Sequence, residues 1–271
     1  MQVGQFDAED NSKLYYDCWP SGWDDPCVIY MHGLESHMGW FSNLAEYLSS
    51  NDINVYAFDR RGSGLNKNNS RNFSSRYLSS DLKIFIDLVK KEHPSSTIFL
   101  IGLCLGGKLA VDFFSYHRDC LDGLILISPS LKSKLKFSLS DKLSILFRPN
   151  SILKVPIKGS MFTSNEKWLK FIEKDSLRLK HIPALHLLEI AKMGRRLKEA
   201  SGNIKLPVLL MLAGVDDIID TAAVRIWFEK LPSRDKVLKF YKDYHHLLTF
   251  EKEADRVMED IVIWIKKRAY A

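Results

Sequence analysis

The sequence has few cysteines, no long apolar run and no secretory leader. Its 271 residues include four cysteines, which show no paired metal-ligand spacing and are too few to suggest a disulfide framework. No run of about 18 consecutive apolar residues occurs, which is the length that a membrane-spanning helix requires. Residues 1–10 lack both the basic and the apolar part of a signal peptide. These absences predict a soluble cytoplasmic protein.

Positive charge is in only modest excess. The formal net charge is +6, and no nucleic-acid-binding motif accompanies it, so we expect no nucleic-acid partner. The basic residues are densest in a few short clusters, and we interpret these clusters as solvent-exposed faces. A weak attraction to anionic lipid headgroups at a membrane surface is the alternative. The clusters are Lys132, Lys134 and Lys136, then Arg195, Arg196 and Lys198, and then Lys266, Lys267 and Arg268.

The chain does contain an alternation of short apolar runs and amphipathic segments. With 46% hydrophobic residues, it is long enough for one sizeable α/β domain. A hairpin is predicted over 3–16, and apolar runs that alternate with helices follow it. Continuous apolar strands in this alternation predict a mostly parallel sheet with helices on both faces. The predicted strands of the alternation are 27–31, 53–58, 97–101, 124–127, 207–212 and 237–241.

The alternation stops between residues 131 and 205, where only helical patterns appear. We therefore predict a core over residues 1–130 and 206–271, with a helical cap inserted over 131–205. The cap carries more apolar side chains than a small helical flap buries by itself. We expect some of them to line a slot for an apolar chain, with Trp168 as a candidate substrate-binding residue; packing onto the core is the alternative. The predicted cap helices cover 139–147, 166–172 and 184–197.

The stretch TIFLIGLCLGGKLAV at 97–111 joins a predicted buried strand to a helix within a few residues. Cys104 lies at the tip of this turn, and Gly102 and Gly106 flank it two positions away. A side chain on so sharp a turn has a strained backbone, and residues without a Cβ let the flanking segments pass closely. The pattern is that of the G-x-S-x-G nucleophile elbow with sulfur in place of oxygen. Because the start of a helix favours a thiolate, we predict that Cys104 is a nucleophile rather than a core cysteine.

An acidic pair and a histidine pair follow the last two predicted strands. Asp216 and Asp217 come first, and His245 and His246 follow them. Polar residues after the carboxyl ends of parallel strands gather at one edge of the sheet, so these side chains can meet Cys104. A histidine within reach of the sulfur would activate it, and a carboxylate on the other ring nitrogen would orient the histidine. The order nucleophile, acid, histidine is that of the α/β-hydrolases.

Taken together, these pieces resemble the monoacylglycerol lipase and lysophospholipase group of α/β-hydrolases, of the serine aminopeptidase S33 type, over nearly the whole chain. The resemblance implies an α/β-hydrolase fold with a helical cap and no metal or cofactor. It also implies a catalytic triad of Cys104, Asp216 and His246, with an oxyanion hole from the backbone N–H groups of Leu34 and Leu105. The matching motifs are HGLESH at 32–37, DRRGSG at 59–64, GLCLGG at 102–107, GVDDIID at 214–220, His246 with Glu251, and FIEKDSL at 171–177.

The sequence departs from that family's pattern at three positions. Cys104 replaces the nucleophilic serine, Leu247 replaces the glutamate after the catalytic histidine, and Asn66 replaces a serine after the glycine-rich DRRGSG motif. The GLCLGG motif also resembles the elbow of dienelactone hydrolases, which use cysteine.

Other residues near these motifs are assigned from their positions. His32 and Gly33 are candidate substrate-binding residues, and the favoured alternative for His32 is that it supports the turn after its strand. Lys108, just after the elbow, is expected to face solvent or a carboxylate. Asp59 and Arg61 are expected to stabilise the loop below the site.

We predict an enzyme that cleaves carboxylic ester or thioester bonds of small acyl substrates through an acyl-enzyme on Cys104. His246 would act as base and then as acid, and Asp216 would orient it. Several alternatives are open: an acyltransferase or a thioesterase that uses the same intermediate, a dienelactone-hydrolase-like enzyme, and a non-catalytic homologue that binds a ligand in the site.

Overall fold

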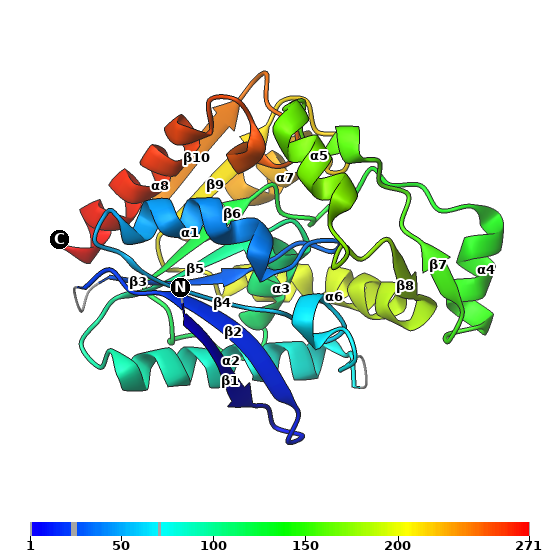
Figure 1. Cartoon of the computed structure of the whole chain (residues 1–271), viewed down its shortest axis with the longest axis horizontal. Helices are drawn as coiled ribbons and strands as arrows, with labels where there is room; N and C mark the ends of the chain where they lie inside the picture. Colours follow the sequence, from blue (N-terminus) through cyan, green and yellow to red (C-terminus); the bar gives the residue numbers. More distant parts are fainter. Residues whose placement is uncertain (1, 23–25, 70–71, 271) are drawn as a thin grey trace.

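A computed structural model describes residues 2–22, 26–69 and 72–270; the other residues of the predicted core lie outside it. Its centre is an eight-stranded sheet with the strand order β1-β2-β4-β3-β5-β6-β9-β10 (Figure 1). The strands β1 and β2 form an antiparallel hairpin, β2 is antiparallel to β4, and the remaining neighbours are parallel. The predicted α/β-hydrolase fold class is confirmed. The strands are β1 Gln2–Asp7, β2 Lys13–Trp19, β3 Cys27–Met31, β4 Asn54–Phe58, β5 Ile98–Leu103, β6 Gly123–Ile127, β9 Val208–Ala213 and β10 Lys236–Tyr241.

Helices cover both faces of the parallel part of the sheet. The helices α1 and α8 pack together on one face, and α2 and α3 pack together on the other (Figure 1). The strands β3, β4, β5, β6 and β9 are buried along their whole length, which explains their continuous apolar sequences. The core helices are α1 Ser42–Ser49, α2 Ser75–Glu92, α3 Leu105–Phe113, α7 Thr221–Glu229 and α8 Ala254–Ala269, and the short 3-10 helices are η1 Met38–Phe41, η2 Gly64–Asn66 and η4 Leu248–Phe250.

The register of the central strands brings their carboxyl ends to one edge. Met31 at the end of β3 pairs with Gly102 of β5, and Leu103 at the end of β5 pairs with Ile127 at the end of β6. The loops that follow β3, β5 and β6 therefore meet at this edge, where open α/β sheets bind their ligands.

The chain between β6 and β9 adds a mostly helical extension, part of which lies well away from the sheet (Figure 1). Helix α6 connects it to the core by packing against α3. The extension also contains an antiparallel pair, β7 and β8, so the prediction of helices alone was wrong here. Strands of three residues are too short to show an alternating pattern. The elements are α4 Leu139–Phe147, β7 Ile152–Lys154, η3 Gly159–Met161, α5 Glu166–Lys174, β8 His181–Pro183 and α6 Ala184–Gly202.

Buried polar contacts attach this extension to the segment after β3. The guanidinium of Arg178 lies 2.7 Å from a carboxylate oxygen of Glu35. Asp175 accepts a hydrogen bond from the indole N–H of Trp40 at 2.6 Å and lies 3.1 Å from Nε2 of His37. These contacts fix the segment after α5 against the sheet edge that carries the site.

No helix in the described ranges is both long enough and apolar enough to cross a membrane.

Candidate active site

The turn between β5 and α3 holds Cys104 in a strained conformation. Its φ is 51° and its ψ is −113°, a backbone conformation that residues with a side chain rarely adopt. Two backbone hydrogen bonds hold it: Cys104 N–H donates to the carbonyl of Ile127 at 3.0 Å, and Ser130 N–H donates to the carbonyl of Cys104 at 2.8 Å. The loop after β6 therefore fixes the thiol at the sheet edge.

The glycines on either side of Cys104 are required by close backbone packing. A Cβ on Gly106 would lie 2.0 Å from the carbonyl oxygen of Met31, and a Cβ on Gly102 would lie 2.6 Å from Cα of Gly107. Both distances are far below van der Waals contact with backbone atoms that cannot move aside. The GLCLGG motif is thus a geometric requirement of the sharp turn.

A buried histidine and a buried aspartate lie in hydrogen-bond contact at the same edge. His246 Nδ1 lies 2.8 Å from Oδ2 of Asp216, and neither side chain is exposed. The other oxygen of Asp216 accepts from the backbone N–H groups of Ile218 and Ile219, each at 2.8 Å. With its oxygens engaged in this way, the carboxylate holds the imidazole in one orientation.

The adjacent acid and histidine occupy different environments. Asp217 is exposed. His245 is bound to Glu251, whose carboxylate accepts from the backbone N–H of His245 at 3.1 Å and lies 3.0 Å from its Nδ1. The side chains that meet are therefore Asp216 and His246, the same register that the family resemblance implies.

The charges of this pair and of the thiol shift the titration of His246. Burial alone lowers the pKa of His246, but the negative charges of Asp216 and Cys104 outweigh it and raise the pKa to about 10. For Asp216, burial opposes ionisation, yet His246 and the two backbone N–H donors lower its pKa. The free ring nitrogen, Nε2, makes no hydrogen bond of standard geometry in the described ranges, although Cys104 is near enough to act on the ring. The arrangement holds a protonated imidazole beside the sulfur of Cys104.

The predicted oxyanion-hole residues lie beside the thiol. Leu34 and Leu105 line the same pocket as Cys104. Leu105 is the first residue of α3, so its N–H has no acceptor within the helix. Gly33 also faces the nucleophile, since a Cβ added there would lie 3.2 Å from Cβ of Cys104.

Arg60, which the sequence reasoning missed, fixes the loop that carries Leu34. Its side chain is almost fully buried, and Nη2 donates to the carbonyl oxygens of Gly33 at 2.7 Å and Leu34 at 3.3 Å. In a planar trans peptide the carbonyl and the N–H of the next residue point in opposite directions. A carbonyl of Gly33 that is held toward Arg60 therefore directs the N–H of Leu34 away from Arg60. Arg60 occupies the variable position of the D-x-R-G-x-G motif, which gives no sequence signal for such a role.

The structure places His32 below the turn after β3 and not among the residues that line the pocket with Cys104. Its side chain is completely buried, Nε2 accepts from the backbone N–H of Arg60 at 3.0 Å, and Nδ1 lies 2.9 Å from the carbonyl of Gly33. Burial, together with the charge of Arg60, holds the pKa of His32 well below its ordinary value. A neutral, doubly bonded imidazole supports the turn after β3, which was the alternative.

The expected loop contacts of DRRGSG are present. Asp59 accepts from the backbone N–H groups of Met38 and Leu65, each at 2.7 Å. Arg61 donates from Nε to Asp81 at 2.6 Å in the buried interior. These bonds stabilise the loop after β4, next to the segment that carries Leu34.

The pocket at Cys104 has a volume of about 110 Å³ and a mostly apolar lining. Part of that lining comes from the extension and was not predicted, because these residues are distant in sequence and meet only through tertiary packing. The expectation that Lys108 faces solvent or a carboxylate was also wrong: it lines this pocket and is 9% exposed. The lining residues besides Leu34, Cys104, Leu105 and Lys108 are Ser130, Ser133, Leu135, Phe137, Ile157, Leu187, Ile190 and Ile218.

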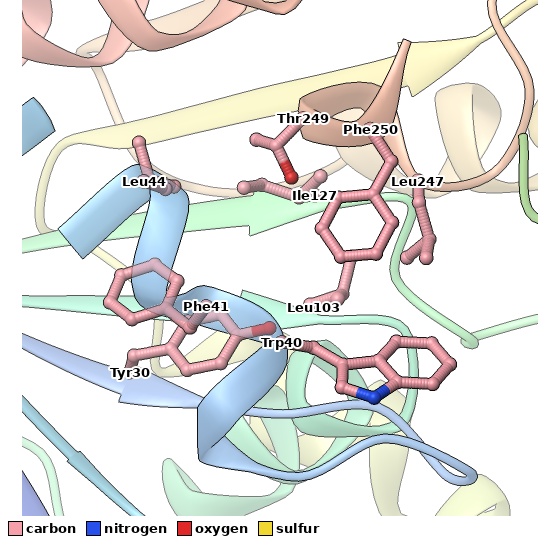
Figure 2. A pocket seen from close by; sticks show the side chains of 9 residues that line it. All are labelled: Tyr30, Trp40, Phe41, Leu44, Leu103, Ile127, Leu247, Thr249 and Phe250. Carbon is pink, nitrogen blue, oxygen red and sulfur yellow. The ribbon is translucent and has the colours of Figure 1, made fainter. Parts of the chain in front are cut away.

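Trp168 does not line that pocket, so the pocket does not support its predicted contact with substrate. Its ring stacks on Phe250, with ring centroids 4.1 Å apart and an interplanar angle of 11°. Phe250 points into a separate apolar cavity between η1, α1 and the sheet (Figure 2). That cavity has a volume of about 10 Å³, the space of a single water at most. Here the alternative holds, because this part of the extension packs onto the core.

The apolar residues predicted to form the slot thus divide into two groups. Phe162 and Ile172 are buried against the core, whereas several side chains of α4 are exposed and do not line the pocket at Cys104. The exposed α4 side chains are Leu139, Leu143, Leu146 and Phe147.

Among the residues that the structure describes, no group of three or more histidine, cysteine or acidic side chains is arranged to hold a metal ion.

Comparisons with known proteins agree with this architecture. The monoglyceride lipase of Rattus norvegicus is 27% identical over 277 aligned residues, which cover 96% of this chain and 88% of the relative. The phospholipase YtpA of Bacillus subtilis is 24% identical, in an alignment that covers 86% of this chain and 92% of YtpA. A soluble variant of the monoglyceride lipase of Saccharomyces cerevisiae, solved with a substrate analog, superposes with a TM-score of 0.87 at 21% identity, covering 100% of this chain and 96% of that chain.

The family described as serine aminopeptidase, S33, matches residues 24–253. That range contains the elbow, the acid and the histidine described above, and it spans most of the chain. The protein therefore belongs to the serine aminopeptidase S33 family, and it has the α/β-hydrolase fold.

Proposed function

We propose that this protein hydrolyses carboxylic esters of small acyl substrates and that Cys104 is its nucleophile. The observation that carries the proposal is the buried contact of 2.8 Å between His246 and Asp216 at the edge where the elbow presents Cys104. The names of the relatives, which are lipases and a phospholipase, support an ester bond as the bond that is cleaved.

The reaction begins with the Cys104 thiolate and the His246 imidazolium. The thiolate attacks the ester carbonyl carbon, and the carbonyl oxygen becomes an oxyanion that accepts from the N–H groups of Leu34 and Leu105. When the intermediate collapses, the carbon–oxygen bond to the alcohol breaks and Nε2 of His246 gives its proton to the departing oxygen. The product of this half-reaction is a thioester on Cys104 and a neutral imidazole.

Water completes the cycle. Neutral His246 takes a proton from water as the water oxygen attacks the thioester carbonyl, and the carbon–sulfur bond then breaks to regenerate the thiolate. Asp216 stays ionised throughout and stabilises the imidazolium. The same site also accepts thioester substrates, and an alcohol that replaces water would make the reaction an acyl transfer.

Intact mass spectrometry after incubation with hexanoyl esters and thioesters tests the proposal. The expected result is a transient gain of one hexanoyl group that maps to Cys104, together with release of the alcohol or thiol. Cys104→Ala should show neither, and Cys120→Ala should behave like the wild type. Turnover that persists in Cys104→Ala, or an acyl group on another residue, would overturn the assignment. Added alcohols and amines separate hydrolysis from acyl transfer, and a small lactone tests the dienelactone-hydrolase-like alternative.

Weak association with anionic membrane surfaces is a separate part of the proposal. The exposed apolar side chains of α4, Leu139, Leu146 and Phe147 among them, support it, because such a face gains free energy in the headgroup region. Co-sedimentation with anionic and zwitterionic vesicles tests it, and equal absence from both pellets would exclude it.

A further inference from the structure

Lys108 is a largely buried lysine that lines the pocket beside Cys104. It lies in the first turn of α3, is 9% exposed and lines the pocket together with Cys104. Within the described ranges, its Nζ forms no hydrogen bond or ion pair, although a lysine ammonium has three donors. An unpaired charge in an apolar environment is costly, and burial accordingly lowers the pKa of Lys108.

The carboxylate whose charge acts on Lys108 is already bound by another cation. Asp112, one turn further along α3, accepts from Nε of Arg196 at 3.0 Å and from Nη2 of Arg196 at 2.9 Å, so both of its oxygens are used. No aspartate or glutamate is among the residues that line the pocket. The charge of Lys108 is therefore not neutralised by a dedicated protein group.

Cys104 does not fill this role either. A charge on Cys104 would act on Lys108, but no hydrogen bond joins the two side chains. The only other polar side chains in the lining are Ser130 and Ser133, and Ser133 Oγ already donates to a backbone carbonyl of the acid loop. A negative group that enters the pocket would find the Lys108 ammonium and the Ser130 hydroxyl as donors within an apolar wall.

We propose that Lys108 makes this pocket selective for substrates that carry a second, anionic group, a carboxylate or a phosphate, a few bonds away from the ester carbonyl. The inference rests on the proposed function, because it assigns the substrate class of the same site. The charge-assisted hydrogen bonds of such a group to Lys108 strengthen in an apolar environment.

Two pairs of substrates, each matched in length, test the inference. In the first pair the charge lies on the acyl side: the 4-nitrophenyl half-ester of hexanedioic acid against its methyl ester. In the second pair it lies on the alcohol side: 1-hexanoylglycerol 3-phosphate against 1-hexanoylglycerol. For each pair, the measured quantity is the ratio of kcat/KM for the anionic substrate to kcat/KM for the neutral one.

In at least one pair, the wild type should prefer the anionic substrate. Lys108→Met should lower that ratio by roughly ten- to hundredfold, the range for loss of a charge-assisted hydrogen bond. Lys142→Met, which removes an exposed lysine of α4, should keep the ratio of the wild type. The pair in which the ratio falls identifies carboxylate or phosphate as the group. Ratios in Lys108→Met that equal those of the wild type in both pairs would overturn the inference, and Lys108→Gln replaces Lys108→Met if the latter does not fold.

A binding measurement separates this inference from the proposed function. Monomethyl hexanedioate should slow the alkylation of Cys104 by iodoacetamide more than dimethyl hexanedioate does, and inorganic phosphate should do so if phosphate is the preferred group. This protection should be lost in Lys108→Met. If the wild type hydrolyses none of the esters but shows this protection, the proposed function fails and the anion site stands. A different result would reject the anion site and keep the proposed function. In that result the wild type hydrolyses the neutral esters, no anion protects Cys104 from alkylation, and Lys108→Met leaves the ratio of kcat/KM values unchanged.

Discussion

Replacement of Arg60 by methionine should slow catalysis although Arg60 does not touch the nucleophile. The change removes both hydrogen bonds from Nη2 to the carbonyls of Gly33 and Leu34, and these bonds set the direction of the Leu34 N–H. Loss of one oxyanion-hole donor costs about 10²- to 10³-fold in kcat, or about 2.7–4 kcal/mol. Because the oxyanion forms only during the reaction, kcat and kcat/KM should fall together while KM changes little.

The assay follows initial rates of hydrolysis of a neutral hexanoyl ester, with thermal unfolding measured in parallel. Arg60→Lys keeps the positive charge but not the planar fork that reaches two carbonyls, so its kcat should lie between those of Arg60→Met and the wild type. Arg61→Met is the matched control, because Arg61 is equally buried but pairs with Asp81. It should lower the unfolding temperature, while the kcat of the protein that remains folded should stay close to that of the wild type. A folded Arg60→Met enzyme with kcat within about threefold of the wild type would refute the reasoning.

Three further outcomes follow from the site. Asp216→Asn should lower kcat by about 10⁴-fold, as loss of the orienting acid does elsewhere, whereas Asp217→Asn should have little effect; the opposite result in initial-rate assays would show that the register is wrong. Because the pKa of His246 is raised to about 10, its proton is lost only as the pH rises through that value. The His246 ring should therefore stay protonated between about pH 6 and 9; an NMR titration of the wild type measures this, and a ring that loses its proton in that range would contradict the raised pKa. Finally, kcat/KM should rise about fourfold for each CH₂ from acetyl esters upward until the pocket is full. Ile190→Ala should flatten that rise and Trp168→Ala should not, whereas a flat profile in the wild type would count against an acyl pocket.

Local patterns in the sequence predicted most of the core and the backbone of the elbow. The predicted strand over 27–31 coincides with β3, because a strand buried on both faces leaves an uninterrupted apolar run. The sharp turn at Cys104 was predictable because close backbone packing excludes a Cβ at Gly102 and Gly106. Such constraints act within a few residues, so a single sequence expresses them.

The lining of the pocket could not be predicted in the same way. Leu135, Ile157 and Ile190 are apolar residues of an insertion in which other apolar residues pack on the core or face solvent. Only the tertiary packing of α6 against α3 determines which of these residues line the pocket, which pack on the core and which face solvent. Lys108 was misassigned for the same reason. The local sequence after the elbow is the same whether this lysine faces solvent or lines a pocket.

Three buried cationic groups lie close enough to Cys104 for a charge on its sulfur to act on them. Burial lowers the pKa of Arg60 to about 10 and also lowers that of Lys108, and it opposes the charged form of His246, yet the negative charge of Cys104 favours the charged form of all three. A thiol becomes a thiolate near neutral pH when cations surround it, whereas a hydroxyl needs a base to take its proton during attack. Asp59 and Asp216 already favour the charged forms of Arg60 and His246, and a thiolate would add to that effect. These surroundings are compatible with the proposed cysteine nucleophile, and the cationic character of the pocket is the feature that a substrate with an anionic group would use.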